Sequence, residues 1–105
     1  MPRPPRVSPA ETAAQLTRGQ VLGYDTERMA FLFTMIYGAR IVDCEISSVA
    51  LDDLDGAKGT RPDEMEIQFR RLRDAVERLA SCAFEQQGRR QRERLRIFSK
   101  HVKAL

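Results

Sequence analysis

Apolar residues in the middle of the chain follow two patterns that are typical of paired strands. Residues 29–37 form an almost continuous apolar and aromatic run, and Gly38 follows directly. Residues 40–46 then alternate between apolar and acidic positions, and the apolar face consists of Val42, Cys44 and Ile46. Two such runs joined by a glycine-containing turn predict a β-hairpin. We expect the first strand to be central in the sheet or covered on both faces, and the second, acidic on one face, to lie at the edge of the sheet.

A later stretch, residues 61–87, has the spacing of an amphipathic helix. Apolar side chains recur there at steps of three and four residues. They are Met65, Phe69, Leu72, Val76, Leu79 and Ala83. Thr60 and Asp63 have the spacing of a capping box at the start of this helix. The stripe predicts one continuous helix that packs on the apolar face of the hairpin.

Two shorter segments complete the pattern. Ser47 or Ser48 can cap a short helical turn that ends at Gly56. Residues 94–105 allow two interpretations, because their apolar positions have helical spacing while residues 95–98 also fit a short strand. We therefore expect the α+β class, with a small antiparallel sheet packed against one long α-helix. The sheet consists of the hairpin, or of three strands if the C-terminal segment adds one.

The distribution of proline divides the chain into an arm and a domain. Four of the five prolines precede residue 10, and each removes a backbone donor. We interpret residues 1–20 as a Pro-rich mobile arm. Residues 21–105 then form a single small α+β domain with a basic C-terminal segment, residues 88–105. The total of 105 residues is an ordinary length for one domain.

The net charge of +3 conceals an uneven distribution. Residues 29–60 carry a net charge of −3, whereas residues 88–105 carry +6. No apolar stretch approaches the ~18 residues that would cross a membrane. Residues 1–19 also contain no apolar block of the kind found in secretory signals. The sequence therefore predicts a cytoplasmic protein that does not associate with membranes.

Few residues of this chain are suited to catalysis or to holding a cofactor. Cys44 is flanked by two acidic residues and points inward in the strand pattern, which predicts a buried, inert thiol. Cys82 lies late in the long helix, where the helix dipole disfavours a thiolate. His101 is the only histidine in the sequence, so no second imidazole can share a metal with it. We expect no cofactor, no metal site and no enzymatic activity.

An acidic segment after the short helical turn superficially resembles a calcium site. It contains Asp52, Asp53 and Asp55. If the pattern starts at Asp53, the EF-hand requires glycine at its sixth position, and this chain has Lys58 there. The mismatch excludes that motif, and we expect an ordinary solvated loop.

A cluster of arginines is the one feature of the sequence with a specific functional meaning. Its members are Arg89, Arg90, Arg92, Arg94 and Arg96. The planar guanidinium group binds phosphate oxygens through two donors, and such contacts weaken as the salt concentration rises. Two other interpretations stay open. The cluster can be a solvated surface that pairs with the protein's own acidic loop, or residues 95–105 can form an apolar helical face for self-association.

A hydrophobic strand, a glycine turn and the sequence Cys-Glu-Ile-Ser at residues 44–47 resemble the domain-of-unknown-function 1488 family of short bacterial proteins. A long helix with Phe69, Arg70 and Arg73 in its first half also resembles the family's pattern. The resemblance covers about residues 24–87. It implies a compact α+β domain in a bacterial cytoplasm and no catalytic or ligand residue. The Pro-rich arm and the arginine cluster depart from the family's pattern.

The sequence thus favours a small bacterial cytoplasmic protein that serves as a non-enzymatic accessory or interaction domain. Its partner would be another protein or a second copy of the chain. The alternative is weak, sequence-nonspecific nucleic-acid binding through residues 89–96. A small enzyme ranks last, because one histidine and two poorly activated cysteines do not supply a nucleophile with a base or a metal set.

Overall fold

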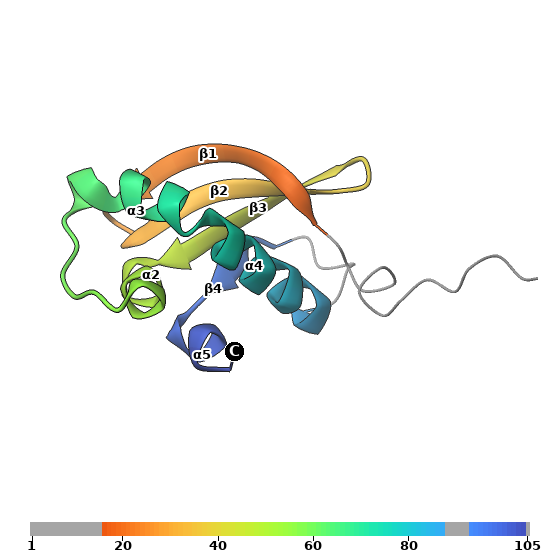
Figure 1. The fold of residues 1–105 in the computed structure, drawn as a ribbon. Helices are drawn as coiled ribbons and strands as arrows, with labels where there is room; N and C mark the ends of the chain where they lie inside the picture. The colour runs from red at the N-terminus through yellow and green to blue at the C-terminus, as the bar shows by residue number, and fades with distance from the viewer. Residues whose placement is uncertain (1–15, 88–92, 105) are drawn as a thin grey trace, which may run out of the picture.

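The computed structural model describes residues 16–87 and 93–104, and it contains one sheet with helices packed on one face (Figure 1). The strands are β1 (Thr17–Asp25), β2 (Ala30–Tyr37), β3 (Arg40–Ser47) and β4 (Leu95–Ile97), in the order β1-β2-β3-β4 across the sheet. The helical segments are α2 (Ser48–Asp55), the 3-10 turn η1 (Pro62–Glu64), α3 (Met65–Arg71), α4 (Arg73–Gln87) and α5 (Ser99–Lys103). The predicted α+β class is confirmed.

The predicted hairpin is formed by β2 and β3. Their antiparallel register runs without interruption from Ala30 opposite Ser47 to Tyr37 opposite Arg40. Gly38 in the connecting turn has a φ of 62°, a left-handed conformation that glycine adopts without the clash of a side chain. The inward-facing positions of both strands are buried, and they are Phe31, Phe33, Met35, Val42, Cys44 and Ile46.

The expectation that the second strand lies at the edge of the sheet is wrong. β4 pairs with β3 in parallel, from Cys44 opposite Leu95 to Ile46 opposite Ile97, so the sheet is mixed. The acidic residue Glu45 on β3 is only 6% exposed. Its carboxylate lies 2.7 Å from Arg28 and 3.6 Å from Arg94. An acidic position on this strand therefore marks a covered ion pair and not a solvent-facing edge.

The sequence pattern does not predict β1, which pairs with β2 along one edge of the sheet. Glycines and polar residues mask its strand character, and two register shifts, Arg18/Val21 and Val21/Gly23, interrupt the pairing. Residues 17–20 belong to this strand, so the boundary of the predicted arm at residue 20 lies too far along the chain. Residues 1–15 of that arm fall outside the described part of the structure.

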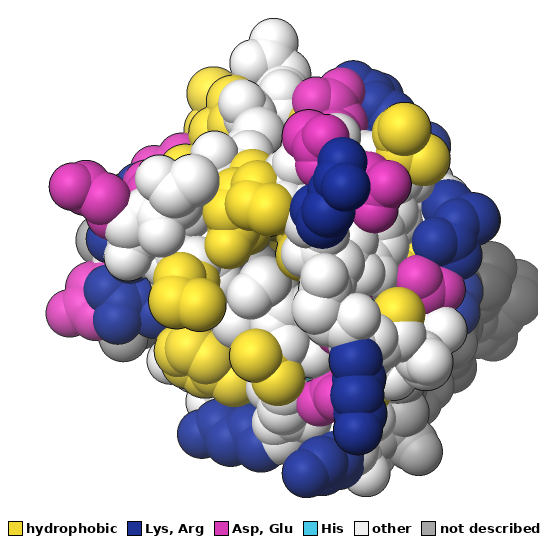
Figure 2. Space-filling model, turned by 90° about the vertical axis from the view of Figure 1, so that its left-hand side faces the viewer, with side chains coloured by type: hydrophobic (Ala, Val, Ile, Leu, Met, Phe, Trp, Pro, Cys, Tyr) yellow, Lys and Arg dark blue, Asp and Glu magenta, His cyan; other side chains and the backbone are white. Residues whose placement is uncertain are grey.

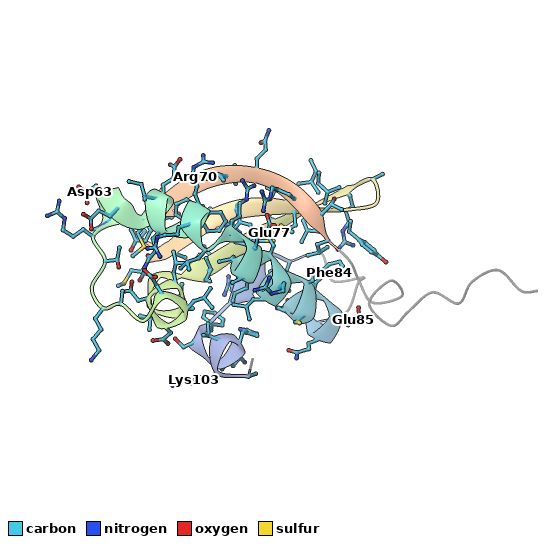
Figure 3. All side chains as sticks on the ribbon, viewed as in Figure 1. Asp63, Arg70, Glu77, Phe84, Glu85 and Lys103 are labelled. Carbon is cyan, nitrogen blue, oxygen red and sulfur yellow. The ribbon has the colours of Figure 1, made fainter. Side chains whose placement is uncertain are left out.

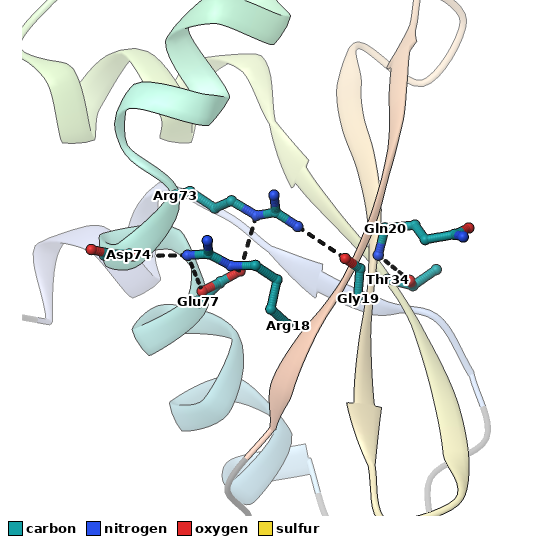
Figure 4. A network of polar contacts seen from close by, with 7 residues as sticks. All are labelled: Arg18, Gly19, Gln20, Thr34, Arg73, Asp74 and Glu77. Carbon is teal, nitrogen blue, oxygen red and sulfur yellow. Dashed lines mark hydrogen bonds and ion pairs between the residues drawn. The ribbon is translucent and has the colours of Figure 1, made fainter.

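A network of ion pairs fastens β1 to α4 (Figure 4). Arg18 lies 2.7 Å from Glu77 and 2.8 Å from Asp74. Arg73 lies 3.1 Å from the same Glu77 and donates to the carbonyl oxygen of Gly19 at 3.0 Å. A Cβ atom at Gly19 would clash with the neighbouring strand β2. The missing side chain therefore allows β1 to lie close to β2 while its carbonyl turns toward the helix.

The helix predicted over residues 61–87 is interrupted in the structure. η1 leads into α3, and α4 continues after a break at Leu72, which has φ −100° and ψ 12°. The N–H of Leu72 reaches the carbonyl oxygens of Gln68 and Phe69 at 3.1 and 3.2 Å. The break allows α3 to contact β1 and β2 while α4 contacts β4 at the opposite edge (Figure 1).

The predicted apolar stripe forms the side of the helices that faces the core. Phe69 is fully buried, and its ring stacks on Phe31 with the centroids 4.6 Å apart. The ring also lies 5.0 Å from that of Phe33. Every stripe residue is buried except Leu72, which is partly buried at the helix break. Burial of these side chains holds the helical layer on the sheet.

Both interpretations of the C-terminal segment are realised in part. Residues 95–97 form the short strand β4, and α5 follows directly. The predicted short helix is α2: the Ser47 hydroxyl accepts a hydrogen bond from the Ala50 N–H at 3.0 Å, and Gly56 ends the helix with φ 72°. Within residues 16–87 and 93–104, no helix combines the length and the apolar character needed to cross a bilayer.

Replacing the central ring tests this packing. We predict that Phe69→Ala lowers the free energy of unfolding by about 3–5 kcal/mol, because the change removes two ring contacts and leaves a cavity. Ile67→Ala is the matched control on the same helix, since Ile67 is 70% exposed; we expect a change below about 0.5 kcal/mol. Urea unfolding followed by circular dichroism measures both. Equal effects of the two changes would contradict the assignment of the core.

Candidate functional site

A hollow of about 840 Å³ lies where the end of α4, the strand β4 and the helix α5 meet. Figure 3 shows the last turns of α4, labelled at Glu85, and α5, labelled at Lys103, at this end of the fold. The side chains that give the hollow its chemistry are Cys82, Arg94, Arg96, Phe98, Lys100 and His101. All of them except Cys82 lie within residues 94–101, and the packing of α4 against β4 brings Cys82 to the others.

The alternation of β4 decides which of its side chains reaches the hollow. Leu95 and Ile97 are buried in the core, whereas Arg96 between them is exposed. The two apolar neighbours fix the backbone on the sheet. Arg96 is therefore presented from a rigid strand and not from a loose connection.

An aromatic pair follows the strand and begins α5. The Phe98 N–H donates to Nδ1 of His101 at 2.8 Å. The two rings stack, with centroids 6.3 Å apart and planes inclined by 22°. Because Nδ1 accepts this hydrogen bond, the imidazole hydrogen lies on Nε2. The Nδ1 atom of His101 is thus engaged by the backbone at the start of α5, while Phe98 is 42% exposed.

Positive charge dominates the lining of the hollow. Arg94, Arg96 and Lys100 contribute to the lining together with one acidic residue, Glu93. Arg94 is partly balanced, since it lies 3.6 Å from the buried carboxylate of Glu45. Arg96 and Lys100 form no ion pair within the described ranges. Uncompensated cations in a concave surface attract an anionic ligand.

Two of the five candidate arginines, Arg94 and Arg96, line this hollow. Arg89, Arg90 and Arg92 lie outside the described residues. The sequence pattern does not predict that Cys82, Phe98 and Lys100 join the arginines in one site. The sequence does contain a pattern that could have indicated the site: if residues 95–98 form a strand, Arg96 points away from the buried Leu95 and Ile97. The equally good helical spacing hides that signal.

The two cysteines differ sharply in their surroundings. Both are free thiols, with Cys44 buried and Cys82 exposed. Burial raises the pKa of Cys44 to about 12, and its thiol donates to the carbonyl oxygen of Val42 at 3.5 Å. The predicted burial of Cys44 is confirmed. Among residues 16–87 and 93–104, no group of three or more His, Cys, Asp or Glu side chains could hold a metal ion.

This difference predicts the reactivity of the thiols. With a maleimide reagent at neutral pH, Cys82 should react in the folded protein and Cys44 should not, because the reactive species is an accessible thiolate. Mass spectrometry should show one label per chain before unfolding in urea and two afterwards. Cys82→Ser is the control and should remove the first label. Two labels on the folded chain would contradict the burial of Cys44.

A second polar cluster fastens the loop that follows α2. Asp52 is buried and accepts hydrogen bonds from the Thr60 hydroxyl at 2.5 Å and from the Gln68 amide at 2.9 Å. The same amide donates to Asp55 at 3.1 Å. Asp55 also holds Arg71 through two contacts of 2.7 and 2.9 Å. The expectation of an ordinary solvated loop is therefore wrong, because all three acidic residues lie in α2 and two of them are held by these contacts.

The predicted capping box is also wrong, because Thr60 is used in this cluster. The 3-10 turn η1 begins after Arg61 without a side-chain cap. The Oε1 atom of Gln68 is buried and has no hydrogen-bond partner in the described structure. Swapping the two ends of this amide would point its oxygen at the carboxylates of Asp52 and Asp55, so their charges fix its orientation. The cluster acts as a clasp between α2 and α3.

The side of the molecule that is at the left in Figure 1 has a mixed surface. In Figure 2 this side shows acidic and basic side chains interspersed around separate hydrophobic patches. No single sign of charge dominates this view. The C-terminal hollow, with its excess of positive charge, is therefore the stronger candidate for a binding site.

Acid should weaken the clasp between α2 and α3. Hydrogen bonding to Arg71, and then to Gln68, lowers the pKa of Asp55 from 3.8 to about 2. Burial acts to raise the pKa of Asp52, but hydrogen bonds from Gln68 and Thr60 outweigh it and leave that pKa lowered. A carboxyl group with a lowered pKa in the folded state stabilises the fold above its unfolded pKa. That contribution is lost as the pH falls through the folded pKa.

We predict that the free energy of unfolding falls between about pH 4 and pH 2, and that it falls less steeply in Asp55→Asn than in the wild type. Asp63→Asn is the matched control, because its exposed carboxylate lies on the same side of the fold without the Gln68 contact. Urea unfolding at several pH values gives the slopes. An Asp55→Asn slope equal to that of the wild type would show that the ionised Asp55 carboxylate does not stabilise the fold through these contacts.

The sequence profile of one protein family covers most of the chain. The family is described as "Protein of unknown function (DUF1488)", and its profile matches residues 19–97. The chain belongs to this family. The resemblance found over about residues 24–87 is thus confirmed, and the family match extends over most of β1 and all of β4. The match runs through the arginine cluster and leaves residues 1–18 outside.

A solved structure shares the fold of this family member. It is the crystal structure of a protein of unknown function from the DUF1488 family of Shewanella loihica PV-4. The TM-score is 0.64 at 21% sequence identity, and the likeness covers 81% of this chain and 91% of the other. At this identity the similarity shows the fold alone. A comparison with curated proteins gives no match.

Proposed function

We propose that this chain is a non-enzymatic interaction domain and that it binds its partner through the hollow around Arg96, Phe98 and Lys100. One observation carries the proposal. Two cations that form no ion pair within the described ranges lie in the same hollow as an exposed aromatic ring. Arginine and aromatic side chains are the residue types that contribute most to binding at recognition surfaces.

The positions of the reactive side chains support a binding role. Nδ1 of His101 accepts the N–H of Phe98, so this nitrogen is not available as a base. The Cys44 thiol is buried, with a pKa raised to about 12 by that burial. Cys82 is accessible but has no hydrogen-bonded base within the described ranges. A nucleophile needs such a base or a lowered pKa to act.

The proposal includes a location and a class of partner. We place the protein in a bacterial cytoplasm, where the partner is another protein or a second copy of this chain. The second candidate function is weak, sequence-nonspecific nucleic-acid binding through residues 89–96. One observation favours it: Arg94 and Arg96 of that cluster line the hollow.

Cys82 provides a direct test, because it lines the hollow and Cys44 should remain unlabelled. A benzophenone attached to Cys82 and irradiated in a bacterial lysate should give defined adducts. Arg96→Glu should remove these adducts, since it reverses a charge of the proposed surface. The chemical identity of the adduct then distinguishes a protein, a second copy and a nucleic acid.

The matched control carries the same probe at a distant exposed position. Ile67→Cys, combined with Cys82→Ser, places it on α3, where residue 67 is 70% exposed. This variant should not give the adducts obtained from Cys82. The same adducts at both positions, or adducts from Cys82 that persist in Arg96→Glu, would contradict the proposal.

A further inference from the structure

We propose that the ligand of the hollow is a single-stranded nucleic acid, with a base stacked on Phe98 and phosphate groups bound by Arg96 and Lys100. This inference rests on the binding site of the proposed function and gives that site its second candidate ligand, a nucleic acid, in place of a protein. It uses only described residues and does not require a contact from residues 88–92. Its support comes from the charge, the aromatic ring and the spacing of these three side chains.

The phosphate-binding part of the site consists of Arg96 and Lys100. Neither forms an ion pair within the described ranges, so neither must give up a carboxylate partner to bind a phosphate. The nearest buried carboxylate, Glu45, is already bound to Arg28 at 2.7 Å and lies 3.6 Å from Arg94. Arginine binds phosphate oxygens through its planar fork, and lysine binds them as a point charge.

Phe98 is the base-stacking part of the site. The residue is 42% exposed, and its ring stacks on that of His101. The hydrogen bond from its backbone N–H to His101 holds the residue at the start of α5. Every base has a flat face, so stacking on such a ring binds single strands with little sequence preference. A duplex hides these faces, which favours an unpaired strand.

The spacing along the chain places these groups on one side. Arg96 lies in β4, and Phe98 directly follows the strand with φ −119° and ψ 173°. Alternate residues of an extended segment point the same way and lie about 6–7 Å apart. A phosphate on Arg96 therefore leaves an adjacent base within reach of the Phe98 ring. The amides of Gln86 and Gln87, which also line the hollow, can donate to and accept from base edges.

The composition of the hollow favours a nucleic acid over a protein. The centres of protein interfaces are depleted in charged residues, and lysine is rare there. Here three cations and one exposed aromatic residue line the hollow, and among the described lining residues only Glu93 is acidic. Nucleic-acid interfaces, by contrast, are polar and strongly positive.

Fluorescence anisotropy tests this inference with the full chain and a labelled single-stranded RNA of about 12 nucleotides. The single strand should bind more tightly than a duplex of the same length at about 50 mM salt. Phe98→Leu keeps an apolar side chain and the backbone hydrogen bond to His101. It should weaken binding about tenfold, because it removes the stacking surface.

Salt dependence tests the phosphate contacts separately. Arg96→Gln should reduce the slope of log K against log salt by about 0.7, the value for one phosphate contact with a single strand. Arg70→Gln is the matched control, because Arg70 is paired with Glu66 on α3, at the other end of the helical layer (Figure 3). It removes the same charge and should leave the slope unchanged.

The outcomes separate this inference from the proposed function. Equal affinity for single strand and duplex, or an unchanged affinity in Phe98→Leu, overturns the assignment of a stacked base. Absence of binding at about 50 mM salt overturns the nucleic-acid ligand altogether. A defined protein adduct from Cys82 would then preserve the interaction domain while this inference fails. Absence of both RNA binding and Cys82 adducts would overturn both.

Discussion

The contact of Phe69 with Phe31 and Phe33 positions the rest of the structure. The ring joins the helical layer to the sheet, and the residues on either side of it in the chain acquire their roles from that placement. Gln68, one residue earlier, is thereby directed at α2 and donates to the carboxylates of Asp52 and Asp55. The break at Leu72, three residues later, lets Arg73 reach the carbonyl of β1. One apolar contact thus sets the position of two polar networks.

Elements with a strong local period could be predicted from the sequence. The alternation of residues 40–46 and the glycine after residue 37 sufficed for the hairpin, because both strands bury one face and meet through a short turn. The helical stripe was equally clear, since it spans several turns and its members enter the core. The break within the helix was not visible, because Leu72 keeps the apolar spacing while its backbone departs from helical geometry.

Features that depend on distant partners could not be predicted in this way. β1 carries glycines and polar side chains, and it is held by its pairing with β2 and by Arg18 and Arg73, which bind the same carboxylate of α4. β4 has only three residues and pairs with a strand about fifty positions earlier. The candidate site shares this limitation. Its arginines were visible as a cluster, but Cys82, Phe98 and Lys100 join them only after α4 and β4 have packed together.

The buried carboxylate of Glu45 has a consequence for how β4 finds its place. A strand of three residues forms too few backbone hydrogen bonds to define its own alignment, and a slip by one residue would turn Arg96 into the core and both apolar anchors outward. Arg94 reaches Glu45 when Leu95 stands opposite Cys44. Glu45, already paired with Arg28, therefore favours this one register of β4 against β3. A buried ion pair of this kind contributes more to the correct register of the strand than to the free energy of unfolding.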